Sequence, residues 1–271
     1  MNIYKDIETR TNGEIYIGVV GPVRTGKSTF IKRFMELMVL PAIADENNRK
    51  RAMDELPQSA AGKTVMTTEP KFIPKEAVEV LFEDGVHFKC RMIDCVGYMV
   101  QGAEGHEEDG KERLVKTPWF DYDIPFTKAA EIGTKKVIYD HSTVGIVVTC
   151  DDTISELDRS AYIQPETQTI QELKTLGKPF IVILNTRKPA SPETLELAQQ
   201  MEAEYGVGVL PINCDQLRKA DVVHIFEALL LDFPVTCVKF DIPKWVEALD
   251  MKEQSNRKSW RRQTRSLVRC I

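Results

Sequence analysis

The chain lacks the features that would place it in a membrane, outside the cell or on nucleic acid. No run in its 271 residues approaches the ~18 apolar residues of a membrane-spanning helix, and the N-terminus has no basic-then-apolar signal pattern. A net charge of −5 provides no general basic surface for nucleic acid. We therefore expect a soluble cytoplasmic protein that has no nucleic-acid partner.

Patterns that indicate disulfides or metal binding are also missing. The six cysteines are far apart and form no C-x-x-C pair, and the four histidines show no ligand spacing. This usage is typical of a reducing compartment rather than of a disulfide framework or a zinc site. The hydrophobic content of 42% is that of an ordinary globular protein, and the length allows one large domain or two small ones.

One octapeptide matches the phosphate-binding loop pattern G-x-x-x-x-G-K-[ST] in full, at residues 21–28. Its two glycines let successive backbone N–H groups curl around a polyphosphate, and the helix that opens at Lys27 adds its positive end. Lys27 then reaches the β- and γ-phosphates, and the Ser28 hydroxyl holds Mg²⁺. We assign the loop to nucleotide binding by Gly21, Pro22, Val23, Arg24, Thr25, Gly26, Lys27, Ser28 and Thr29.

The surroundings of this loop fit the motif. Residues 14–20 form an apolar run of strand length that ends just before Gly21, and residues 27–40 carry apolar side chains at helical spacing before Pro41. A phosphate-binding loop requires this order of strand, loop and helix. The alternative, an accidental glycine-rich turn, explains neither flank.

The remaining pattern predicts an α/β fold of the P-loop NTPase type. Asp84-Gly85 is a hairpin signal between the apolar runs 76–83 and 86–94. Further apolar runs alternate with helical patterns, which is typical of a mostly parallel sheet with helices on both faces. The expected strands are 142–150, 179–185 and 207–213, and the expected helices are 165–177, 192–205 and 220–233.

Two further elements point to a triphosphate. Asp94 and Gly97 form a D-x-x-G segment at the end of a strand, where Asp94 can hold Mg²⁺ through water and the Gly97 amide can contact the γ-phosphate. Thr67 or Thr68, in the polar stretch before the hairpin, can complete the Mg²⁺ shell when the third phosphate is present. The plainer alternatives are a β-turn aspartate and solvated loop hydroxyls.

The order of loop, switch threonine, hairpin and D-x-x-G resembles the translation-factor-related class of GTPases. That class reads guanine with the aspartate of an N-K-x-D motif, but this chain has Asn185-Thr186-Arg187-Lys188. Lys188 is a donor where guanine's N–H groups need an acceptor, so guanine selectivity should be lost and adenine becomes the expected base. Asn185 keeps its place in the motif and is assigned to the nucleotide site.

Two other positions depart from that class. Tyr98 stands where the class often has a water-orienting glutamine, so we expect Thr67 or Thr68 to position the water instead. Arg24 stands where some relatives have an asparagine that recruits potassium. Its guanidinium either supplies that charge internally or pairs with an acidic neighbour on the surface.

Taken together, these residues resemble the stage IV sporulation protein A family, over residues 1 to about 255. The resemblance rests on the stretches "GVVGPVRTGKSTFIKRFMELMVLP", "LPQSAAGKTVMTTEPKFIPKEAV", "RMIDCVGYMVQGAEG" and "ILNTRKP". It implies an ATPase on a GTPase-like fold, in which Lys27 is the phosphate-loop lysine and Thr67 and Thr68 are paired sensor threonines. The catalytic set we expect is Lys27, Thr67, Thr68, Arg24 and Asp94, with Ser28, Thr67 and Asp94 holding Mg²⁺.

The resemblance also implies a cellular role. ATP hydrolysis in that family drives irreversible polymerisation of the protein into the base layer of the endospore coat, at the outer forespore membrane. The implied partners are other copies of the chain, a small amphipathic membrane-bound coat protein and other coat proteins. From the residues alone, a regulatory GTPase of the ribosome-assembly class and a nucleotide-stabilised structural protein remain open.

We expect an ATPase domain over residues 1–240, with an insertion rich in glycine and charge at about 98–140. Residues 241–271 would begin a following region. The last 15 residues, 257–271, carry six basic residues and no acidic one. Such a tail either binds an acidic surface or results from an altered reading frame.

Overall fold

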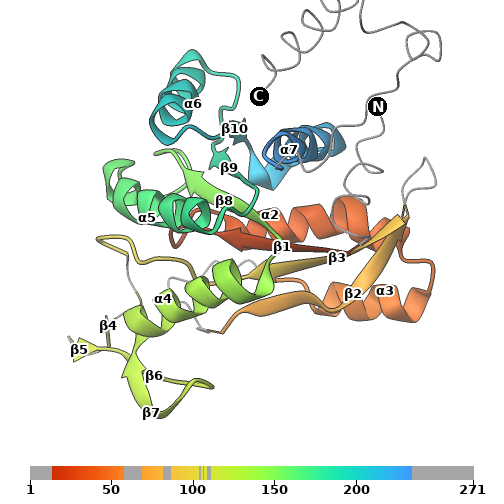
Figure 1. Cartoon of the computed structure of the whole chain (residues 1–271), viewed down its shortest axis with the longest axis horizontal. Coiled ribbons are helices and arrows are strands. Elements are labelled where there is room, and N and C mark those ends of the chain that lie inside the picture. The colour runs from red at the N-terminus through yellow and green to blue at the C-terminus, as the bar shows by residue number, and fades with distance from the viewer. Residues whose placement is uncertain are drawn as a thin grey trace, which may run out of the picture. The chain divides into compact units, whose positions relative to one another are not determined.

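A mostly parallel sheet forms the centre of the structure, a computed structural model that describes residues 14–57, 69–81, 87–103, 105, 107–108 and 111–233 (Figure 1). Within these residues its six strands are, in sheet order, β10 (Val209–Ile212), β9 (Phe180–Asn185), β8 (Val144–Cys150), β1 (Glu14–Val20), β3 (His87–Asp94) and β2 (Lys71–Leu81). Only β2 runs antiparallel to its neighbour. The predicted fold class, including the antiparallel hairpin strand, is confirmed.

Strands β8 and β9 form where apolar runs continue without alternation. Every residue of β8 and β9 is buried, as expected for parallel strands covered on both faces. The hairpin strand β2 begins before the predicted residue 76, because Phe72 and Ile73 already pair with Ile93 and Met92 of β3.

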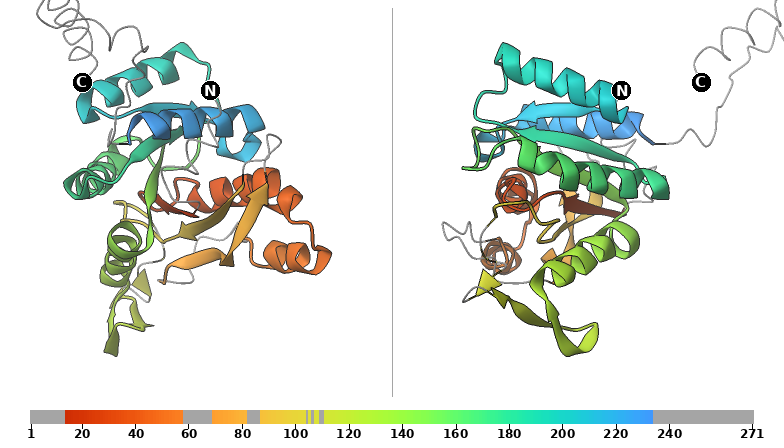
Figure 2. Two further views of the ribbon diagram at one scale, coloured as in Figure 1. Left: turned by 45° about the vertical axis from the view of Figure 1, so that its right-hand side comes forward. Right: turned by 90° about the vertical axis from the view of Figure 1, so that its left-hand side faces the viewer.

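Helices cover both faces of the sheet (Figure 2). One face packs against α2 (Lys27–Phe34) and α7 (Lys219–Leu231). The other packs against α5 (Ser160–Leu176), α6 (Pro192–Tyr205) and the π-helical end η3 (Val137–His141) of α4 (Phe126–Lys136). These two cores hold the carboxyl ends of β1, β3, β8 and β9 in one line, where ligands bind in such sheets.

The helix after the phosphate-binding loop is helical over the predicted range, but it is not α-helical throughout. It changes at Met35 into a π-helical turn, η1 (Met35–Val39), and then into a 3₁₀ turn, η2 (Leu40–Ala42). In the π turn the Leu40 N–H bonds to the Met35 carbonyl. Pro41 explains the change, because it has no N–H and its ring cannot continue a regular α-helix.

The expected insertion at 98–140 contains a helix that the sequence analysis did not predict. Two short hairpins, β4 (Glu107–Glu108) with β5 (Lys111–Glu112) and β6 (Leu114–Thr117) with β7 (Phe120–Pro125), occupy its first part. The remainder is α4 and the start of η3, which bury Phe126, Ala129, Ala130, Val137 and Ile138. The second part of the segment is therefore a layer of the fold.

The sequence indicated neither disulfides nor a membrane-spanning helix, and the described residues bear on both points. Cys90, Cys95, Cys150 and Cys214 are buried free thiols. Among the helices placed in the structure, none combines the length and apolarity needed to cross a bilayer.

Two short elements complete the described fold. A short helix, α3 (Glu46–Asp54), lies in the polar stretch after η2, and a 3₁₀ turn, η4 (Cys214–Gln216), follows β10.

Two parts of the predictions fall on residues that are not described. Thr67 and Thr68 lie within residues 58–68, so their assignment to catalysis and to Mg²⁺ stays a prediction. Residues 234–271 include the expected boundary at 240, the region 241–271 and the basic tail, which also stay predictions.

Candidate nucleotide-binding site

The phosphate-binding loop joins β1 to α2, as its motif predicts. Gly21 has φ +128°, and a β-carbon there would lie 2.4 Å from the Val148 carbonyl oxygen, so only glycine fits. The Thr25 hydroxyl closes the loop by donating to the Pro22 carbonyl at 3.0 Å. The loop thereby presents the first turn of α2 to the end of the sheet, where its free N–H groups favour an anion.

Lys27 lies inside this loop. Its Nζ donates to the carbonyl oxygens of Gly21, at 3.3 Å, and Pro22, at 2.5 Å, and the residue is 5% exposed. Burial lowers the pKa of Lys27, and the nearby Cys95 and Asp94 oppose this effect. The ammonium is thus partly desolvated and stands beside the backbone arc that would receive phosphates.

Ser28 and Asp94 form the second half of the site. The Ser28 hydroxyl donates to Asp94 Oδ2 at 2.7 Å, which joins the start of α2 to the end of β3. Asp94 Oδ1 is buried and accepts no hydrogen bond from the described residues. Burial raises the pKa of Asp94, against the Ser28 hydrogen bond and the Lys27 charge.

A hydroxyl and a carboxylate with an unused buried oxygen are the hard ligands that Mg²⁺ prefers. A divalent cation would satisfy that oxygen and favour the ionised carboxylate. Ser28 and Asp94 therefore fit the expected metal.

Gly97 places the D-x-x-G segment directly on the phosphate-binding loop. It has φ +96°, and a β-carbon would lie 2.1 Å from the Gly21 carbonyl oxygen and 2.7 Å from Lys27 Nζ. The next residue, Tyr98, accepts a hydrogen bond from the Val23 N–H at 2.9 Å. The two predicted motifs therefore meet, although about 70 residues separate them in the sequence.

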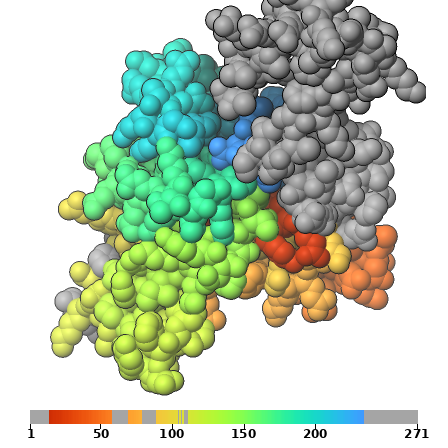
Figure 3. Space-filling view, in the orientation of Figure 1, coloured from red at the N-terminus to blue at the C-terminus, as the bar shows by residue number. Residues whose placement is uncertain are grey.

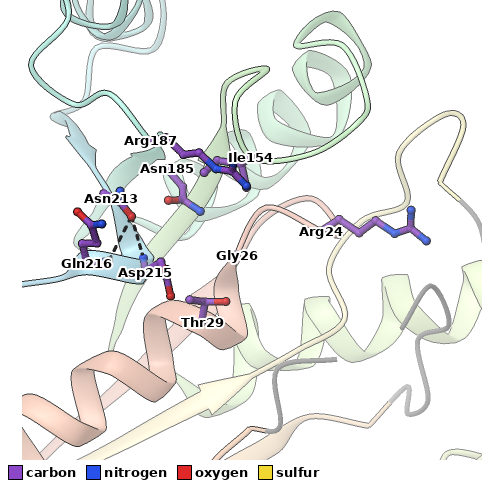
Figure 4. A pocket seen from close by; sticks show the side chains of 9 residues that line it. All are labelled: Arg24, Gly26, Thr29, Ile154, Asn185, Arg187, Asn213, Asp215 and Gln216. Carbon is purple, nitrogen blue, oxygen red and sulfur yellow. Dashed lines mark hydrogen bonds between the residues drawn. The ribbon is translucent and has the colours of Figure 1, made fainter. Parts of the chain in front are cut away.

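A cavity of about 530 Å³ opens beside the loop, at the carboxyl ends of β8, β9 and β10 (Figure 4). It is large enough for a purine and its ribose. Four segments of the chain line it, and most of the lining side chains are polar: Arg24, Gly26, Thr29, Ile154, Asn185, Arg187, Asn213, Asp215 and Gln216.

Asn185 lines this cavity, and its side chain forms hydrogen bonds to two other parts of the protein. Its amide nitrogen donates to the Thr25 carbonyl at 2.9 Å, and its Oδ1 accepts from the Cys214 N–H at 3.0 Å. It therefore ties the phosphate-binding loop to the loop after β10. Only one of the two amide N–H donors is used by these bonds, so its assignment to the nucleotide site stays a prediction.

Arg24 and Lys188 are the two departures that bear on charge and on the base. Arg24 is exposed with φ +64°, and its side chain points away from the other labelled residues in Figure 4. Its proposed charge at the phosphates stays a prediction. Lys188 is exposed, while its neighbour Arg187 is part of the cavity lining.

The loop after β10 was not predicted as part of the site. Asn213 Oδ1 accepts from the N–H groups of Asp215, at 3.1 Å, and Gln216, at 3.2 Å, and all three side chains line the cavity. A signal was available, because these polar residues directly follow an apolar strand at the ligand-binding edge of the sheet.

Comparison with known proteins agrees with this geometry. Residues 1–234 match the sequence model of the family described as "Stage IV sporulation protein A, ATPase domain". The chain belongs to this family. The predicted resemblance to stage IV sporulation protein A is thereby confirmed.

Curated relatives named "Stage IV sporulation protein A" are identical to the chain at slightly more than half of the aligned positions. The protein from Clostridioides difficile (strain 630) is 56% identical over 249 residues, and that from Bacillus subtilis (strain 168) is 52% identical over 249 residues. The protein from Bacillus anthracis is 51% identical over 250 residues. Each alignment covers 92% of this chain and 51% of the relative, so the chain spans about half the length of these proteins.

Proposed function

We propose that this chain binds Mg²⁺–ATP at residues 21–29 and hydrolyses it to ADP and phosphate. The observation that carries the proposal is the contact between the two motifs: Ser28 bonds Asp94 at 2.7 Å, and Gly97 faces both Gly21 and Lys27. A loop that binds phosphates and a D-x-x-G strand end are the two parts that phosphoryl transfer needs in one place.

Each residue has a defined task in this proposal. Lys27 exchanges its bonds to loop carbonyls for bonds to the β- and γ-phosphates, which gain a charge-assisted partner. Ser28 and Asp94 would hold Mg²⁺, which neutralises charge on the β- and γ-phosphate oxygens. The Gly97 amide donates to the γ-phosphate, and Thr67 or Thr68 orients the attacking water.

Adenine is the proposed base. Guanine presents an oxygen at C6 that needs a donor, whereas adenine presents an amino group that needs an acceptor. The N–H groups of Cys214, Asp215 and Gln216 already bond to the side chains of Asn185 and Asn213. These backbone N–H groups are therefore not free to donate to the C6 oxygen of guanine, and Lys188 stands where the resembled GTPases have the acidic residue that reads guanine.

We further propose that hydrolysis drives self-assembly of the basement layer of the bacterial endospore coat. The family's name and the resemblance support this part. The partners would be other copies of the chain, a small amphipathic membrane-bound coat protein and other coat proteins. The place would be the mother-cell cytoplasm, at the outer forespore membrane.

Substitution of Lys27 by Ala tests whether Lys27 binds the phosphates of ATP. Loss of a charge-assisted bond to phosphate should weaken ATP binding by about tenfold to a hundredfold. Equilibrium titration with a fluorescent ATP analogue measures this. Lys50→Ala, an exposed lysine paired with Glu46 on α3, is the control and should bind normally. Equal affinity in wild type and Lys27→Ala would remove Lys27 from the site.

The double substitution Thr67→Ala/Thr68→Ala separates binding from turnover. It should retain ATP affinity and lose most of the hydrolysis rate, because the expected role of these hydroxyls begins only when the γ-phosphate is in place. Single-turnover phosphate release measures the hydrolysis rate, and the same titration measures the ATP affinity. An unchanged rate excludes both threonines from catalysis.

A further inference from the structure

Tyr98, the residue after D-x-x-G, directs its side chain away from the phosphate site. Its hydroxyl donates a short hydrogen bond to the Glu172 carboxylate of α5, and the residue is only 5% exposed. Glu172 belongs to the helical layer on the sheet face opposite α2. The side chain is therefore used within the fold, where the resembled GTPases place a water-orienting group.

The Glu172 carboxylate is itself held by neighbours. It accepts from Gln168 Nε2 at 3.4 Å on the same helix, and it lies 3.7 Å from Lys135 Nζ of α4. Lys135 also pairs with Glu131 at 2.8 Å. Helices α4 and α5 lie side by side on this face, as the green and yellow-green surfaces show (Figure 3). The acceptor of the Tyr98 hydroxyl is thus a nearly buried carboxylate fixed between two helices.

The same residue is also fixed through its backbone. The Tyr98 carbonyl accepts from the Val23 N–H at 2.9 Å, and Tyr98 pairs with Pro22 as a parallel bridge. Gly97 therefore lies in the sequence between two residues that are held by hydrogen bonds, Tyr98 and Asp94, and Asp94 bonds Ser28. Glycine is the most permissive residue of the backbone, so its orientation depends on how firmly its neighbours are held.

We propose that Tyr98 is a positioning residue, which holds the Gly97 amide toward the γ-phosphate by anchoring the D-x-x-G segment to Glu172. This inference rests on the proposed nucleotide site and adds a residue to it. The tyrosine acts through the backbone and touches no substrate. The D-x-x-G segment then serves as a fixed platform, and a side chain elsewhere must orient the water.

Tyr98→Phe tests this inference, because it keeps the buried ring and removes only the hydroxyl. A contact made by Gly97 to the γ-phosphate is present with a non-hydrolysable ATP analogue and absent with ADP. We expect the analogue to bind about fivefold more weakly and ADP to bind unchanged, as one lost net hydrogen bond would give. Hydrolysis should slow by a similar factor. Calorimetric titration of the full chain with both nucleotides gives the ratio of the analogue affinity to the ADP affinity.

Tyr205→Phe is a matched control. The Tyr205 hydroxyl also donates to a carboxylate of α5, that of Glu166, at 2.7 Å, and its other partner is Thr167 of the same helix rather than the D-x-x-G segment. It should leave the ratio of analogue to ADP affinity at the wild-type value. Glu172→Gln keeps an oxygen acceptor and should be milder than Glu172→Leu, which should reproduce Tyr98→Phe.

The outcomes separate this inference from the function on which it rests. If wild type hydrolyses ATP and Tyr98→Phe keeps the wild-type affinity ratio, the positioning role is wrong and the proposed function stands. If Tyr98→Phe weakens both nucleotides equally and lowers the melting temperature, the hydroxyl only stabilises the fold. A wild-type chain that binds neither nucleotide overturns both proposals.

Discussion

Gly97 lies where a side chain would displace the phosphate-binding loop. Its positive φ excludes most L-residues, and the space that a β-carbon would need is taken by the Gly21 carbonyl and the Lys27 ammonium. The sequence predicted each of the two motifs from its spacing, but it did not predict this contact between them. Spacing alone selected Lys27, Ser28, Asp94 and Gly97 as candidates, and the structure brings them together.

Gly97→Ala should damage the site at this scale. Backbone strain of about 1–3 kcal/mol adds to the clash with Gly21, so we expect lower stability and at least tenfold weaker ATP binding. Gly208→Ala is the matched control, because a β-carbon there meets no atom within 4 Å. Urea unfolding and ATP titration of both variants give the comparison. A Gly97→Ala protein with wild-type affinity would mean that the two motifs do not form one site.

The role of Asn185 could not be predicted at the same scale. Its partners, Thr25 and Cys214, are 160 and 29 residues away, and only the folded sheet brings them together. The bond from Tyr98 to Glu172 spans 74 residues and has no sequence signal for the same reason. Motifs show which residues meet a ligand, but they do not show which residues hold the motifs together.

Most of the helices and strands were predicted from the spacing of apolar residues and from capping signals. Ser191 caps α6 by accepting from the Thr194 N–H, with Pro192 as the first helical residue, and Gly206 ends the helix in the left-handed conformation. Helix α4 was not predicted, because the charged and glycine-rich residues before it masked its apolar face. Nonlocal burial, rather than composition, decides such a case.

A buried ion pair joins three of these elements. Arg159 and Glu166 pair at 2.7 Å, and the Glu166 side chain, fully buried, also bonds Thr149 of β8 and Tyr205 of α6. Burying a charge is costly unless its partners remain. The pair therefore fixes how α5 and α6 stand on the sheet beside the nucleotide cavity.

Arg159→Met should destabilise the chain by about 3–5 kcal/mol, because it leaves Glu166 buried and unpaired. Lys50→Met, which removes one partner of an exposed pair with Glu46, should cost less than about 1 kcal/mol. Denaturant midpoints at pH 7 measure both. If the two variants lose equal stability, the buried network does not anchor these helices.

At the scale of the whole molecule, the proposed function would couple nucleotide hydrolysis to assembly. The cavity, the phosphate-binding loop and the D-x-x-G segment lie along one edge of a single sheet and contact each other, so the proposed contacts to the base and to the γ-phosphate would come from neighbouring segments. The mostly parallel sheet with helices on both faces was predicted from the sequence, but the order of its strands was not. The cavity-lining loop at 213–216 was not predicted either, because local turns rather than a motif place its side chains.

Phosphate release measured with ATP and with GTP, while light scattering follows assembly in the same tube, tests the central claim most directly. We expect turnover of ATP, at least tenfold slower turnover of GTP, and a rise in scattering that follows ATP hydrolysis. Equal or faster turnover of GTP, or assembly at saturating ATP without phosphate release, would contradict it.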